Sequence, residues 1–103
     1  MIADNEIPYF MWDERLTAAE VRRELAHASQ SRRIDLMAKI MRDARVSDTW
    51  QFMTPRDIAA HRDALFARLG WHKDFWVFLY NKWIENELLA AEPYIDRGPG
   101  RLP

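Results

Sequence analysis

Residues 73–91 read KDFWVFLYNKWIENELLAA, and this stretch decides the fold. Advanced by 100° per residue, its apolar side chains fall on two faces. The broader face carries Trp76, Val77, Tyr80, Trp83, Ile84 and Leu88, and the nearly opposite face carries Phe75, Phe78, Leu79 and Leu89. A helix that is apolar on two sides either lies at the centre of its domain or forms part of an interface. Both alternatives predict a helix over residues 73–91.

Two helices are predicted upstream from their start signals. Thr17 and Glu20 have the spacing of a capping box, so we expect a first helix from Thr17 down to Ser29. Ser29 or Ser31 can cap a second helix that runs to about Arg45. Apolar residues recur at helical spacing in both segments, which indicates that each helix packs one face against the rest of the domain.

A further helix is predicted between the second helix and residue 73. Thr54 followed by Pro55 is typical of a helix start, and Gly70 is a natural residue for its end. The intervening residues 46–53 look irregular. They bring three apolar side chains that we expect to fill the core: Trp50, Phe52 and Met53.

Together these segments predict an all-α protein, a compact four-helix domain with an extended aromatic N-terminal arm and an irregular C-terminal tail. Residues 1–16 form the arm, because Pro8 breaks any helix there. Residues 17–91 form the helical domain. Residues 92–103 are rich in Pro and Gly and form a flexible tail.

Composition favours a folded, soluble chain. Its 103 residues suit one domain, and 49% of them are apolar and 30% charged. No cysteine is present, which excludes disulfides, thiolate zinc sites and a cysteine nucleophile. The sequence shows neither a secretory signal nor an uncharged apolar stretch of bilayer length, so we expect a cytoplasmic protein and no membrane partner. Five Trp, five Phe and three Tyr are more ring surface than a small domain can easily bury, so part of it is expected to face a partner.

Charge is distributed unevenly although the formal net charge is only −1. Residues 4–20 contain five acidic residues and one basic residue, whereas residues 22–45 contain seven basic and three acidic residues. This excess is either a mild basic face or the ordinary charge of solvated helix surfaces. A basic face would offer four arginines for phosphate contacts: Arg32, Arg33, Arg42 and Arg45.

Motifs that suggest catalysis are incomplete. Glu24 and His27 have the Glu-x-x-His spacing of di-iron bundles, but the second such pair is missing. His61-Arg62-Asp63 matches the tripeptide of a kinase catalytic loop without the other kinase motifs. The three glycines all follow residue 69, so no phosphate-cradling loop is expected. We therefore predict no enzymatic activity, no cofactor and no metal.

A helix-turn-helix joined at Gly70 is also disfavoured. A recognition helix needs Arg, Lys, Asn or Gln near its N-terminus to read base edges, but this one begins with Phe75, Trp76, Val77 and Phe78 after His72 and Lys73. Nucleic-acid binding remains an alternative through the arginines of the second helix.

Several segments resemble a family of small bacterial proteins. They are Pro8-Tyr9-Phe10-Met11-Trp12-Asp13, residues 39–45 (KIMRDAR), Trp50 with Phe52, Thr54-Pro55, Leu69-Gly70 and the Phe75-Trp76-x-Phe78-Leu79-x-x-x-Trp83 helix. Members of this family are often encoded beside AbiE-type nucleotidyltransferase toxins. The resemblance implies an antitoxin-like role and supplies no catalytic residues. The chain departs from the family pattern at Asp43, where Glu is common, and at His72-Lys73, where a richer basic run often follows.

The leading hypothesis is a non-catalytic, antitoxin-like protein-binding module. Its partner would be another protein, with a nucleotidyltransferase toxin as the candidate that the resemblance implies, or a second copy of the chain. Aromatic side chains tend to dominate interface energies. The residues predicted to bind the partner are Tyr9, Trp12, Trp76, Phe78, Tyr80 and Trp83.

Overall fold

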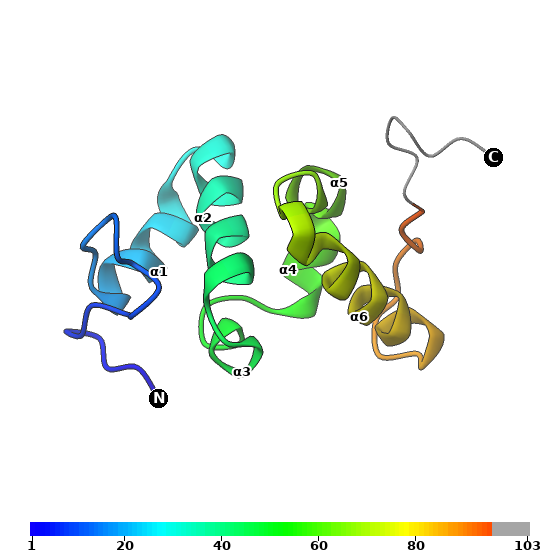
Figure 1. Cartoon of the computed structure of the whole chain (residues 1–103), viewed down its shortest axis with the longest axis horizontal. Coiled ribbons are helices and arrows are strands. Elements are labelled where there is room, and N and C mark those ends of the chain that lie inside the picture. The colour runs from blue at the N-terminus through cyan, green and yellow to red at the C-terminus, as the bar shows by residue number, and fades with distance from the viewer. Residues whose placement is uncertain (96–103) are drawn as a thin grey trace.

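The computed structural model describes residues 1–95, which form a helical arrangement (Figure 1). The elements in these residues are α1 (Ala18–His27), α2 (Gln30–Asp43), α3 (Val46–Thr49), α4 (Pro55–Ala60), α5 (Arg62–Phe66), the 3₁₀ turn η1 (Gly70–His72) and α6 (Lys73–Glu85). Figure 1 shows α2 between α1 on one side and the group of α4, α5 and α6 on the other. Of the helices in residues 1–95, none is long and apolar enough to cross a membrane.

The predicted count of four helices is wrong, because the described residues contain six. The segment expected to be irregular holds the single helical turn of α3. The expected third helix is divided at His61, whose backbone angles (φ −126°, ψ 22°) leave the helical region. Gly70 adopts a left-handed conformation (φ 55°) as expected, but a 3₁₀ turn then leads directly into α6. The breaks let the short helices α3 and α5 pack against α2.

The N-terminal arm completes the start of α1. Thr17 is the N-cap, and it forms the predicted capping box with Glu20. The first two N–H groups of the helix have no partner within it. Ala18 donates instead to the carbonyl of Glu6 at 2.8 Å, and Ala19 donates to the carbonyl of Asp4 at 3.0 Å. The arm therefore supplies hydrogen bonds that α1 needs.

Charge also fixes the arm, because the acidic N-terminal segment and the basic residues after it pair with each other. Arg22 contacts Asp4 at 2.7 Å, and Arg32 contacts Glu14 at 2.7 Å. Lys39, which is almost fully buried in α2, pairs with Asp13. Much of the basic excess of residues 22–45 thus binds the chain's own arm.

The core is built from the buried side chains of the arm, α1, α2, α4, α5 and the inward face of α6. Trp76 and Tyr80 of α6 are only 2% and 0% exposed. The indole Nε1 of Trp76 donates to the carbonyl of Met41 at 2.9 Å. This carbonyl lies in the last turn of α2, where acceptors lack a partner within the helix. Trp76 thereby joins the two longest helices by both packing and a hydrogen bond.

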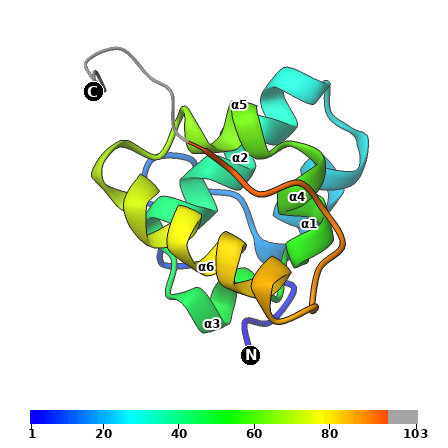
Figure 2. The same cartoon turned by 90° about the vertical axis from the view of Figure 1, so that its right-hand side faces the viewer.

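α6 ends earlier than the predicted residue 91. Glu87 takes a left-handed conformation (φ 61°) and donates to the carbonyl of Ile84, while the N–H of Leu88 donates to the carbonyl of Trp83. These two bonds form a Schellman motif, which terminates the helix. The chain then turns back across the molecule beside α6 (Figure 2).

The first residues of the predicted tail are held against α6. Asn81 bonds both the N–H and the carbonyl of Tyr94, at 2.9 and 3.1 Å. The Tyr80 hydroxyl donates to the carbonyl of Glu92 at 2.8 Å. The remainder of the predicted flexible tail, residues 96–103, lies outside the described residues.

Candidate functional site

The six aromatic residues predicted to bind a partner differ in how far the structure exposes their rings. Tyr9, Trp12 and Phe78 are 51%, 72% and 60% exposed. Trp76 and Tyr80 are buried, so the structure places these two predicted partner-binding rings in the core. Trp83 is half-buried and packs against the core. The helical spacing correctly separated two apolar faces of α6, but it is the broader one, with Trp76 and Tyr80, that packs inward.

Tyr9 is exposed, yet polar bonds fix its ring. Its hydroxyl donates to a carboxylate oxygen of Asp48 at 2.7 Å and accepts from the backbone N–H of Arg45 at 2.7 Å. Partial burial raises the pKa of this phenol, so the hydroxyl stays protonated and able to donate. The edge of the ring also meets Phe10, with 5.4 Å between ring centroids. Tyr9 therefore presents about half of its surface from a defined position.

Trp12, three residues further along the arm, makes a cation–π contact with α2. The ammonium group of Lys39 lies 5.0 Å from the centre of the indole. The same ammonium pairs with Asp13 and lies 3.9 Å from Asp43. A hydrogen bond from Lys39 lowers the pKa of the Asp13 carboxyl. We call the exposed rings of Tyr9 and Trp12 the arm surface.

The outer face of α6 carries a second set of exposed rings. Phe78 is flanked by Lys82, whose ammonium lies 5.7 Å from the ring centre. Phe75, at 49% exposure, stands on the same face and meets the edge of Trp76 at 5.5 Å. We call Phe75 and Phe78 the α6 surface. Sequence reasoning placed Phe75 on this face but did not select it as a binding residue.

Trp71 is the most exposed of the tryptophans, at 85%, and sequence reasoning did not select it. Its indole stacks on the imidazole of His72 with centroids 3.7 Å apart. No local signal distinguished it, because the residue after a helix-ending glycine often packs back against the last turn of the helix.

Trp50 was expected to fill the core, but the structure does not place it there. It is 37% exposed and packs by its edge on Trp76 and Trp83, with centroid distances of 6.0 and 5.6 Å. Met53 is buried and Phe52 is partly buried, so these two residues fill the interior as expected. Trp50 instead lines a shallow hollow of about 360 Å³ together with Trp83 and Pro55.

The four candidate phosphate-binding arginines do not form one basic surface. Arg32 is paired with Glu14 and Glu24, and the bond with Glu14 raises the pKa of this guanidinium. Arg42 donates to the carbonyl of Arg68 at 2.7 Å, and Arg45 lies over the ring of Tyr9. Arg33 lies beside Arg32, at the opposite end of α2 from Arg42, a separation of roughly 15 Å at 1.5 Å per residue. This arrangement gives little support to nucleic-acid binding through α2.

Metal-binding side chains do not gather in the described part of the chain. Within residues 1–95, no three His, Asp or Glu side chains are grouped as metal ligands. Glu24, from the Glu-x-x-His pair, is engaged by Arg32 at 3.0 Å. Comparisons with family models, with curated proteins and with solved structures gave no match to this chain.

Proposed function

We propose that the protein is a non-catalytic binding module, an antitoxin-like partner of a nucleotidyltransferase-type toxin, and that it binds through the arm surface. The observation that carries the proposal is that Tyr9 and Trp12 are exposed although Tyr9 is held by two hydrogen bonds and Trp12 lies beside the Lys39 ammonium. An exposed ring with no role in the core is unfavourable in water. Two such rings, three residues apart, are instead suited to burial against another protein.

Energetics favour this use of the rings. A side chain that must be immobilised on binding costs about 0.5–1.5 kcal/mol, and rigid aromatic residues reduce that cost. The Tyr9 hydroxyl already has both of its hydrogen-bond partners within the chain. Trp12 is already placed over Lys39. The arm surface therefore offers large apolar area without much further ordering.

The toxin as partner rests on the resemblance of the arm and α6 motifs to proteins encoded beside such toxins. The direct test is to co-express the chain with the product of the adjacent gene and to purify through a tag on one of them. A complex of fixed stoichiometry in size-exclusion chromatography is expected. If the two proteins elute separately at micromolar concentration, the proposed partner is wrong.

Substitutions then locate the interface. Trp12→Ala is expected to weaken the complex at least tenfold, since buried tryptophans are frequent hot spots worth about 2 kcal/mol or more. Trp71→Ala is the matched control, because it removes an exposed tryptophan that is outside the arm surface. Equal affinity of Trp12→Ala and the unmodified chain, measured by isothermal titration, would remove the arm surface from the interface.

A further inference from the structure

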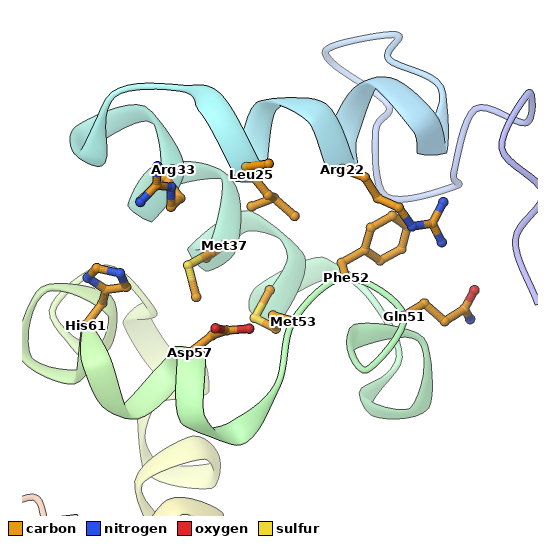
Figure 3. Close-up of a pocket in the computed structure, with 10 residues that line it drawn as sticks. Arg22, Leu25, Arg33, Met37, Gln51, Phe52, Met53, Asp57 and His61 are labelled. Atoms are coloured by element: carbon orange, nitrogen blue, oxygen red, sulfur yellow. The ribbon is translucent and has the colours of Figure 1, made fainter.

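A pocket of about 420 Å³ lies between α1, α2 and the segment 51–61 (Figure 3). Its floor is apolar and is formed by Leu25, Met37, Phe52 and Met53. In the view of Figure 3, Arg33 and His61 lie toward one end, while Arg22 and Gln51 lie toward the other. This size falls in the range of sites that hold small organic molecules. An apolar floor with a few polar groups at its ends is also typical of such sites.

Arg33 stands out among the charged groups of this pocket. None of the ion pairs within residues 1–95 involves its guanidinium. One terminal nitrogen donates to the carbonyl of Ala28 at 3.2 Å. Its Nε is shielded from solvent and has no acceptor. A buried donor without an acceptor is unfavourable, more so in a charged group, and an anion at this end of the pocket would compensate it.

The other charges of the pocket are already matched. Arg22 pairs with Asp4 at 2.7 Å and lies over the ring of Phe52 at 4.8 Å. Asp57 accepts from the backbone N–H of Thr54 at 2.8 Å and so closes the capping box of α4. Arg33 is therefore the cation of the pocket without a carboxylate partner, and His61, which lines the same end, can add a hydrogen-bond donor.

We propose that this pocket binds a carboxylate that carries a compact apolar group. The carboxylate would accept charge-assisted hydrogen bonds from Arg33 once the guanidinium turns its N–H groups toward the pocket. The apolar group would cover Leu25, Met37 and Met53. This inference does not depend on the proposed toxin partner, because the pocket is lined by neither the arm surface nor the α6 surface.

The same chemistry can come from a free acid or from an acidic side chain beside an aromatic one in a peptide. The full chain is titrated with 3-phenylpropanoate and with acetyl-Phe-Glu-amide, and backbone amide shifts are followed by NMR. The uncharged controls are 3-phenylpropanamide and acetyl-Phe-Gln-amide. Shifts at Leu25, Arg33 and Met53 are expected for at least one acid, which identifies the source. The matching amide is expected to bind at least tenfold more weakly.

Variants test the role of Arg33. Arg33→Gln is expected to weaken acid binding about tenfold, Arg33→Lys to retain most of it, and the exposed Arg23→Gln to leave it unchanged. Ala26→Trp changes a surface residue of α1 and is expected to block the pocket while Arg33 stays in place. A loss of binding in this variant therefore tests the pocket even if the Arg33 variants fold poorly. Acids that bind no better than their amides, or that bind Arg33→Gln as tightly as the unmodified chain, would overturn the proposal.

Discussion

At the scale of single residues, the tryptophans have different roles that their shared chemistry does not reveal. Trp76 is buried and bonded to the carbonyl of Met41, Trp50 is partly exposed, and Trp71 is exposed. Removing a fully buried tryptophan costs about 3–5 kcal/mol. Its loss here would also leave the Met41 carbonyl without that donor.

We therefore expect Trp76→Ala to reduce the free energy of unfolding by about 3–5 kcal/mol. Trp50→Ala is expected to cost less than half as much, because the ring retains access to water at 37% exposure. Trp71→Ala, at 85% exposure, should change stability by no more than about 0.5 kcal/mol. Urea denaturation measures all three. A larger loss for Trp50→Ala than for Trp76→Ala would contradict this placement of the two rings.

At the scale of elements, carboxylates attach the arm to the helices. A hydrogen bond from Lys39 lowers the pKa of Asp13, a bond from Arg32 lowers that of Glu14, and the backbone of Thr17 lowers that of Glu20. A carboxyl whose pKa is lower in the folded state favours folding above its unfolded pKa. That contribution is lost as the pH falls through the folded pKa.

The ion pairs between the arm and α2 are therefore expected to be lost below about pH 4, where unperturbed carboxyl groups titrate, while the buried Phe10 and Met11 still hold the arm in the core. The indole N–H signal of Trp12 in NMR should shift with a midpoint below that value. In Lys39→Met, which removes the partner of Asp13, the carboxyl carbon of Asp13 should titrate at a higher pH. An Asp13 midpoint that is the same in both proteins would contradict the assigned ion pair.

Local signals in the sequence were sufficient to predict where α1, α2 and α4 begin. Thr17, Ser29 and Thr54 are N-caps in the structure, because each cap depends on residues within three positions of it. The break at His61 and the end of α6 were not predicted. The return of the chain depends on bonds from Tyr80 and Asn81 to residues 92–94, which local patterns do not encode.

The candidate site was predictable to a similar extent. The sequence indicates that α6 has two apolar faces, but the choice of the inward face depends on α2 and α5. Arm residues Tyr9 and Trp12 could be selected because the arm has no helical face to bury. The arginines could not be judged from charge alone, since Glu14 and Glu24 reach Arg32 only in the folded chain.

At the scale of the whole molecule, stability is expected to differ between the two ends. In Figure 1, the arm and α1 lie at one end and α6 at the other, with α2 between them. The arm and α1 rely partly on exposed ion pairs such as Arg22–Asp4, whereas α2 contributes buried aliphatic side chains and α6 the buried rings of Trp76 and Tyr80. Exposed ion pairs contribute little, typically below about 1 kcal/mol each.

Native-state hydrogen exchange should therefore show partial opening of the arm end. The amides of Val21 and Leu25 in α1 are expected to exchange with a lower opening free energy than those of Ile40 and Tyr80. Exchange can be measured by NMR at several low concentrations of denaturant. Identical opening free energies for all four amides would indicate a single cooperative unit instead.

The hydroxyl of Tyr9 links distant parts of the chain. α3 is a single turn without a side-chain N-cap, and such a turn does not persist by itself in water. The backbone N–H of its N-cap residue, Arg45, and the carboxylate of its Asp48 both bond a phenol 36 or more positions earlier in the chain. Any molecule that displaced this phenol would loosen the turn and shift the neighbouring Trp50, so the intrinsic fluorescence of that indole would report an event at the arm.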